Sequence, residues 1–135
     1  MSNDQPKAPD RPTLLTFWRK LAYMLSSGVP LLESIEAIAV DLRGTAAEAV
    51  LAQIKQEIEM GRTLSTALES RPDVFSGMSV SLMRVAEIEG ALHNGPQRIA
   101  DGIENGTIEI GQAEPATPPS AELVAETAEA QEAST

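Results

Sequence analysis

Glycine and proline divide this sequence into short segments, and each segment carries apolar residues at helical spacing. In the first segment Leu14, Trp18 and Leu21 recur at intervals of four and three residues, which places them on one face of a helix. Further segments repeat the pattern as far as Gly106. Glycine stops a helix because it adopts the left-handed conformation at little cost, and proline is excluded from a helix interior. The chain therefore predicts an all-α fold.

The predicted helices are joined by connections of two to six residues, which favour antiparallel neighbours in a compact six-helix bundle. Thr13 is expected to cap the first helix because Pro12 cannot lie deep inside one. The expected helices run from Thr13 to Gly28, from Pro30 to Gly44, from Thr45 to Gly61, from about Thr63 to Pro72, from Met78 to Gly90, and from Pro96 onward.

The last two helices have less regular patterns. The sixth is expected to begin only at Pro96, because the run Asn-Gly-Pro at 94–96 interrupts its stripe. The expected core face of the fifth helix consists of Met78, Leu82, Val85 and Ala86.

Both ends of the chain differ in composition from the helical region. Residues 1–12 contain three prolines and predict a disordered arm, residues 13–106 form the helical bundle, and residues 107–135 predict an acidic disordered tail. The formal charge is −10, and half of it lies in the last 25 residues, which have no Lys or Arg. Such a tail either keeps a protein in solution or docks onto a basic partner, and we favour the first role.

Composition and charge exclude several classes of protein. The chain has no cysteine, so disulfide scaffolds and thiolate metal sites are ruled out. An acidic chain repels phosphate backbones and anionic lipid surfaces, which argues against nucleic-acid binding and against a helix-turn-helix regulator. No segment approaches the roughly 20 apolar residues of a membrane span. We expect a cytoplasmic protein without a direct membrane span.

Motifs that support catalysis or cofactor binding are also missing. His93 is the only histidine, and no zinc, nucleotide-phosphate or serine-nucleophile motif occurs. Glu33 and Glu36 share a helix face, but a hard-cation site needs several converging oxygens, so a solvated face is the favoured interpretation. We therefore expect no enzyme, no cofactor and no metal. A metal- or ligand-binding helical domain built on these clustered acids is the alternative.

Two features stand out on the predicted helices. The first helix is apolar around much of its circumference, with Phe17, Trp18 and Met24 either buried in the bundle, which we favour, or forming an apolar interface. The second feature is a pair of acids, Glu87 and Glu89, just before the stop at Gly90. Acids there oppose the helix dipole, which suggests a salt bridge or a partner contact.

The corners of the chain, in their order, resemble the cytoplasmic domain of the inner-membrane platform proteins of type II secretion and type IV pilus systems, the F-protein family. The likeness extends over about residues 14–104. It is carried by the segments FWRKLAYMLSSGVPLLESI at 17–35, GRTLSTAL at 61–68, PDVF at 72–75 and VAEIEGAL at 85–92.

This resemblance implies a six-helix up-and-down bundle and a role that is not enzymatic. Family members form the platform on which pseudopilins are assembled, and their cytoplasmic domains contact the assembly ATPase and neighbouring platform proteins. The family's characteristic corners correspond here to fold determinants that are also candidate interface residues, namely Gly28, Pro30, Gly61, Ser65, Glu87 and Gly90.

The chain departs from the family by having a single copy of the domain and no span, whereas members usually carry two copies and several transmembrane helices. Pro96 also falls where the resemblance places an apolar helical residue, which implies a shortened or displaced last helix. We expect a protein–protein interaction module that docks an assembly ATPase or a membrane platform subunit, placed at the inner membrane through its partners. A truncated platform component without independent function is an alternative, and self-association is a further one.

Overall fold

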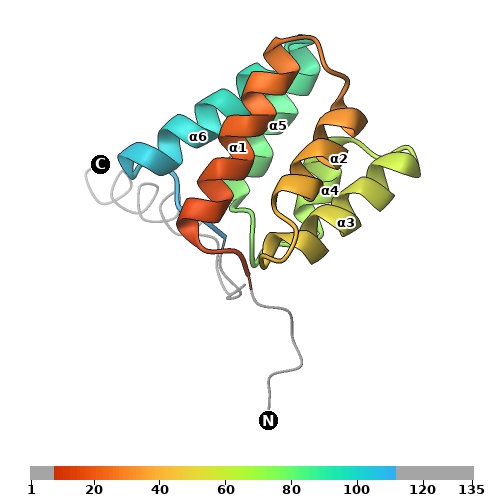
Figure 1. Cartoon of the computed structure of the whole chain (residues 1–135). Helices are drawn as coiled ribbons and strands as arrows, with labels where there is room; N and C mark the ends of the chain where they lie inside the picture. Colours follow the sequence, from red (N-terminus) through yellow and green to blue (C-terminus); the bar gives the residue numbers. More distant parts are fainter. Residues whose placement is uncertain (1–7, 112–135) are drawn as a thin grey trace, which may run out of the picture.

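The computed structural model describes residues 8–111, which fold into six helices without a strand (Figure 1). Each helix packs antiparallel against the next in the chain, and the last returns to the first, so the bundle closes as a ring. The predicted all-α six-helix architecture is confirmed. The helices are α1 (Arg11–Ser26), α2 (Leu31–Asp41), α3 (Ala47–Glu59), α4 (Leu64–Glu69), α5 (Gly77–Glu89) and α6 (Asn94–Asn105).

A single apolar core fills the ring, and aromatic side chains lie within it. Trp18 of α1 is fully buried, and its ring centroid lies 4.8 Å from that of Phe17 and 5.9 Å from that of Phe75. Both pairs are edge-to-face, the arrangement that aromatic rings prefer. The predicted stripe of α1 is buried at Leu14, Trp18 and Leu21.

The start of α1 differs from the prediction. The helix begins at Arg11, and the Asp10 side chain caps it by accepting a hydrogen bond of 3.0 Å from the Thr13 N–H. Pro12 lies in the first turn, where a proline sacrifices no intrahelical hydrogen bond. The boundary placed between residues 12 and 13, and the cap assigned to Thr13, are therefore wrong.

Helix α5 is rotated relative to the predicted core face. Met78 and Val85 are 54% and 41% exposed, whereas the core takes Val80 and Met83. Of the predicted stripe only Ala86 is buried, so the prediction for this face is wrong. The helix carries apolar residues on both sides, and its contacts with α4 and α6 decide which side faces inward.

Helix α6 begins at Asn94, two residues before the predicted start. Pro96 occupies the third position of the helix and is buried there. The first backbone N–H groups of a helix have no intrahelical acceptor, so a proline at this position leaves the helix intact. The predicted start of the sixth helix at Pro96 is therefore wrong.

Residues 107–111 fold back onto the bundle. Ile108 is buried, and its N–H donates a hydrogen bond of 2.9 Å to the carbonyl of Gly102. The Gly111 N–H donates to the Val74 carbonyl at 3.0 Å. The bundle therefore extends five residues past the predicted boundary at 106. The predictions for 1–7 and for 112–135 lie outside the described residues.

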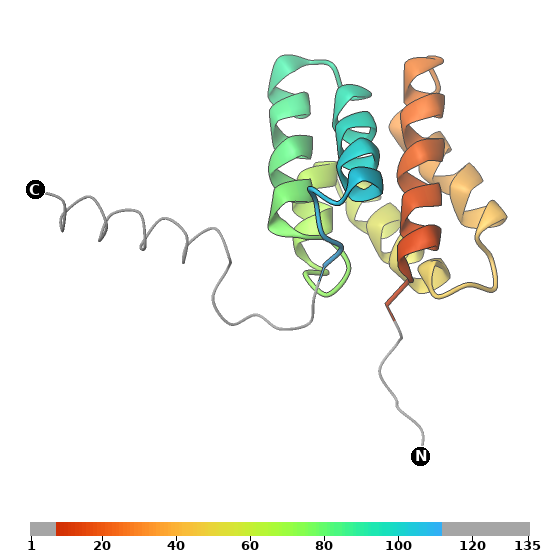
Figure 2. The ribbon, with the colours of Figure 1, turned by 90° about the vertical axis from the view of Figure 1, so that its left-hand side faces the viewer.

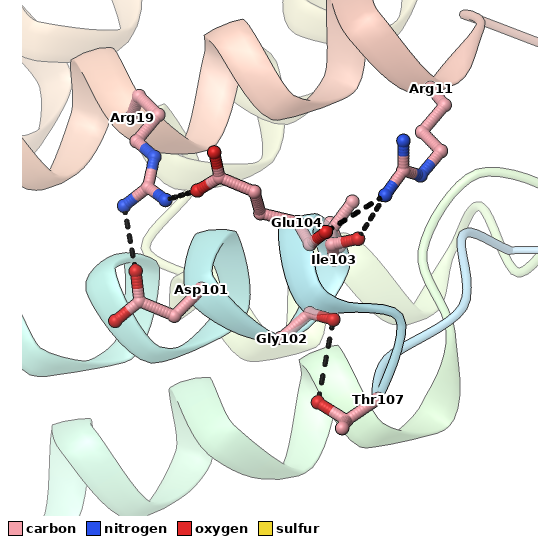
Figure 3. A network of polar contacts seen from close by, with 7 residues as sticks. All are labelled: Arg11, Arg19, Asp101, Gly102, Ile103, Glu104 and Thr107. Atoms are coloured by element: carbon pink, nitrogen blue, oxygen red, sulfur yellow. Dashed lines mark hydrogen bonds and ion pairs between the residues drawn. The ribbon is translucent and has the colours of Figure 1, made fainter.

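A polar network joins α1 to α6 (Figure 3). Arg19 forms ion pairs with Asp101, at 2.8 Å, and with Glu104. Arg11 donates hydrogen bonds to the carbonyl oxygens of Ile103 and Glu104, at the last turn of α6. A cation at this end of a helix is favoured by the helix dipole. The network therefore lies along the seam that closes the ring.

The contact between α6 and residues 107–111 leaves no room for a side chain at Gly102. A Cβ atom there would clash with Cδ1 and Cγ1 of Ile108, whose side chain is buried. We expect Gly102→Ala to lower the free energy of unfolding by about 1–3 kcal/mol, as overpacking does. Gly77→Ala is the matched control, because a Cβ at Gly77 meets nothing within 4 Å. Thermal unfolding compares the two, and an equal melting temperature for both variants would contradict the prediction.

An ion pair in the connection between α4 and α5 makes stability depend on pH. The guanidinium of Arg71 donates to both carboxylate oxygens of Asp73, at 2.9 and 2.7 Å. These hydrogen bonds, together with the charge of Arg71, hold the pKa of Asp73 below its ordinary value. A lowered pKa contributes stability that is present above the unfolded-state pKa, about 4, and is lost as the pH falls through the folded-state pKa.

Replacement of this carboxylate is therefore expected to reduce the acid sensitivity of the bundle. Asp73→Asn should lower the free energy of unfolding by about 1 kcal/mol at pH 7. The effect is modest because solvent screens a partly exposed ion pair. The difference between the variant and the wild-type chain should shrink between pH 5 and pH 3. Urea unfolding at a series of pH values measures it, and a difference that stays constant over this range would contradict the assignment.

Candidate functional site at the corner end

Three of the five connections lie at the same end of the bundle. Because successive helices are antiparallel, the chain turns at this end after α1, α3 and α5. In Figure 2 the α5–α6 connection and the end of α1 lie at the top, whereas the described chain ends lie at the bottom. We call residues 23–30, 60–65 and 87–93 the corner end. All six predicted corner residues fall within it.

The three corners share one backbone geometry. At each, a glycine closes the helix with a positive φ, of 92° at Gly28, 94° at Gly61 and 75° at Gly90. After α3, the Gly61 N–H donates to the Ile58 carbonyl and the Arg62 N–H to the Glu57 carbonyl. This pair of hydrogen bonds defines the Schellman motif, and equivalent pairs follow α1 and α5. The glycines therefore act as fold determinants.

Glu87 links two of these corners through Ser65. One carboxylate oxygen accepts a hydrogen bond of 2.9 Å from the Ser65 N–H, and the other accepts one of 2.7 Å from the Ser65 hydroxyl. Ser65 is buried and lies in the first turn of α4, where backbone N–H groups have no intrahelical acceptor. The carboxylate thus completes the cap of a helix that lies 22 residues earlier in the chain.

This contact explains one of the two acids at the end of α5. Glu87 opposes the dipole of its own helix but lies against the positive end of α4, which offsets the cost. The suspected partner is therefore inside the chain. Glu89, two residues on, is exposed and has no ion pair among the described residues.

Pro30 and Ser34 shape the first corner. Pro30 is the residue immediately before α2, one position earlier than the predicted first turn. Ser34 is fully buried, and its hydroxyl donates to the Val29 carbonyl at 3.4 Å. The sequence analysis missed this contact. Ser34 lies on the apolar face of α2 between Leu31 and Ile35, so its position was the available signal.

The aromatic residues of α1 do not form a surface. Phe17 and Trp18 are 1% and 0% exposed. They are therefore buried in the bundle, as favoured, and the alternative prediction of an apolar interface at these two residues is wrong. Met24 is half-buried and lines a hollow of about 370 Å³ together with the Lys20–Asp41 ion pair. Tyr23, also at this hollow, is 72% exposed.

Other side chains of the corner end are also exposed. Met60, at the α3–α4 corner, is 58% exposed although it is apolar. Arg62 next to it pairs with Glu57 at 3.3 Å. His93 is half-buried at the start of α6. The corner end therefore combines a fixed backbone with exposed apolar and acidic side chains.

The acids on α2 do not assemble into a cation site. Glu33 and Glu36 are exposed, and Glu36 pairs with Lys55 of α3 at 3.4 Å. Within residues 8–111 no three acidic or histidine side chains come together in a way that could hold a metal ion. The described part of the chain thus gives no support to the metal-binding alternative.

Comparison with known proteins places this fold in a family. The family model for type II secretion system (T2SS) protein F matches residues 17–109, which include every corner described above. The chain belongs to this family. The family is a non-enzymatic component of secretion and pilus assembly, so the prediction of a platform-protein domain without enzymatic activity is confirmed.

Several relatives of the F family share about a third of the aligned residues. The type 4 fimbrial assembly protein PilC of Pseudomonas putida is 33% identical over 99 residues, which are 73% of this chain and 25% of the relative. The type II secretion system protein F of Vibrio cholerae is 32% identical over 94 residues, 70% of this chain and 23% of the relative. This member of the F family thus spans about a quarter of the length of the curated relatives it matches.

One expectation concerns the membrane. In the portion of the chain that the structure describes, no helix has the length and apolar character needed to cross a bilayer.

Proposed function

We propose that this F-family domain is a docking module that binds the assembly ATPase or a membrane platform subunit of a secretion or pilus system. The family match over residues 17–109 is the observation that supports this role. The module works on the cytoplasmic side of the inner membrane and is held there through its partners. The chain covers about a quarter of the longer relatives, so the docking role proposed here corresponds to one part of those proteins.

The corner end is the docking surface in this proposal. Its backbone is fixed by three Schellman closures and by the Glu87–Ser65 hydrogen bonds, so a partner meets a preorganised surface and orders little on binding. Tyr23 and Met60 supply exposed apolar contacts on that surface, and half-buried Met24 lies beside Tyr23. These side chains are held in place by the six corner residues, Gly28, Pro30, Gly61, Ser65, Glu87 and Gly90.

Binding by the full chain tests the proposal, with two matched variants. Met60 and Val40 are 58% and 57% exposed, but Met60 lies at the corner end, whereas Val40 lies outside it, near the carboxyl end of α2. We expect Met60→Asp to weaken binding to the ATPase or platform subunit of the same organism by about tenfold, because a buried contact becomes a charge. Val40→Asp should leave binding unchanged. Biolayer interferometry with purified partners gives both affinities.

Two results would overturn this function. If the folded chain binds neither partner, it is a platform component without independent function, and its family membership reflects fold and ancestry. If both variants weaken binding equally, docking does not use the corner end. Circular dichroism of each variant shows that the bundle is intact, which separates loss of docking from loss of fold.

A further inference from the structure

Helix α5 has a second apolar face that the bundle does not cover. Its core side consists of Ser79, Val80, Met83 and Ala86. A surface helix normally carries polar residues on the opposite side, but here large apolar residues continue around it. The outer face of α5 contains exposed Met78, half-buried Leu82 and exposed Val85, and at its edge, beside exposed Ser81, lies Ile88, which is 80% exposed.

The position of α5 leaves this face open. The helix packs against α4 and α6, and in Figure 2 it forms one edge of the bundle. From Met78 to Ile88 the face covers ten residue steps, which correspond to about 15 Å along a helix axis. This length matches a partner helix of about three turns.

The charge around the outer face indicates what covers it. Arg84 is paired with Glu69 of α4 at 3.3 Å, so its charge is compensated within the bundle. Glu89 lies on the same side as Met78 and Val85, is exposed, and has no ion pair among the described residues. The negative end of the α5 dipole adds to its charge. The carboxyl end of this face therefore favours a cation.

The chain itself offers no suitable occupant. A second copy carries the same net charge of −10, so the mutual repulsion of two chains disfavours it as the occupant. Residues 112–135 contain five glutamates and no Lys or Arg, and residues 1–7 contain one large apolar residue. An anionic membrane is disfavoured by the same charge.

We propose that the outer face of α5 binds an amphipathic helix of a partner protein, with an apolar ridge of about three turns and with Lys or Arg at the end that meets Glu89. This surface shares Ile88 and Glu89 with the corner end, but it does not include Tyr23 and Met60, the apolar contacts proposed for docking there. The inference therefore stands whether or not the assembly ATPase binds there. It also gives Glu89 the role that the structure of the chain alone leaves open.

A titration with two synthetic peptides tests the inference. Both are 18-residue helices with a leucine ridge, one with lysines flanking the ridge and the other with glutamates at the same positions. They are added to the full chain labelled with ¹⁵N. The lysine peptide is expected to shift the amide resonances of α5 in a saturable way, and the glutamate peptide should bind at least about tenfold more weakly.

Variants assign the contact to the outer face. Val85→Asp should lower the affinity of the chain for the lysine peptide by about tenfold, whereas Val40→Asp on α2, which is also exposed, should leave this affinity unchanged. Glu89→Gln should lower the affinity for the lysine peptide several-fold without altering the fold. This variant still tests the contact if Val85→Asp unfolds the chain.

The proposal is overturned by any of three results. These are absence of binding by the lysine peptide, equal binding of the two peptides, and resonance shifts that map away from α5. Shifts on α5 that depend on protein concentration without peptide would assign the face to a second copy, which also overturns it. The affinity for the assembly ATPase is measured separately with Met60→Asp, so the two proposals fail independently.

Discussion

Trp18→Ala is expected to lower the free energy of unfolding by about 3–5 kcal/mol, because it removes the largest buried side chain and leaves a cavity. Trp18 is fully buried, and its ring lies edge-to-face against Phe17 of the same helix and against Phe75 in the segment before α5. A single domain of this size is stable by about 5–15 kcal/mol, so the substitution removes a large part of the total. Urea unfolding followed by circular dichroism measures it, since the variant lacks the only tryptophan of the chain.

Trp18→Phe provides the control for this prediction. The indole Nε1 of Trp18 is buried and has no hydrogen-bond partner within residues 8–111, so a phenyl ring loses volume but none of the hydrogen bonds described there. We expect this variant to lose less than half as much stability as Trp18→Ala. A loss below about 1 kcal/mol for Trp18→Ala would mean that the residue is not in the core.

Glu87→Ala is the second large effect, with an expected loss of about 2–3 kcal/mol. The substitution removes a charged acceptor from two hydrogen bonds and leaves the Ser65 N–H without its acceptor. Glu87→Gln should cost about 1 kcal/mol, because the amide keeps the shape and loses the charge. Glu89→Ala should change stability by less than about 0.5 kcal/mol, since Glu89 is exposed and has no ion pair among the described residues.

A double-mutant cycle with Ser65→Ala separates this contact from general effects. If the carboxylate and the hydroxyl interact as the 2.7 Å distance indicates, the two losses should fall short of additivity by about 1–2 kcal/mol. Additive losses would show that Glu87 stabilises the bundle by some other route. Thermal unfolding of the four chains gives the coupling energy.

The apolar pattern of the sequence predicted the six helices because most of them have one apolar face. In α1 and α3 the predicted faces are the buried ones, from Leu14 to Leu21 and from Ala47 to Ile54. In α5 the pattern is apolar on both sides, and periodicity alone does not tell which side faces the core. Contacts with α4 and α6 decide it, and these depend on the whole bundle.

The candidate site was predicted in part. The corner residues were recognised from glycine and proline positions, and Glu87 was noticed because an acid at a helix end is locally unfavourable. Its partner Ser65 lies 22 residues away, and only the register between α4 and α5 brings the two together. Local sequence rules contain no information about that register.

The segment after α6 shows that average composition does not predict the structure of a short segment. Residues 107–111 border an acidic region and were assigned to it, yet Ile108 fills the space above Gly102. Two isoleucines alternate with polar residues there, and this alternation was the local signal. An average over a long tail conceals such a short apolar run.

Site-specific photocrosslinking tests the central claim that the corner end docks onto the assembly machinery. A photoreactive residue is placed at position 60 in one full-length chain and at position 40 in another, two sites of nearly equal exposure of which only the first lies at the corner end. Our account predicts a crosslink to the assembly ATPase or to a platform subunit from position 60 and none from position 40. A crosslink to these proteins from position 40 alone would contradict it.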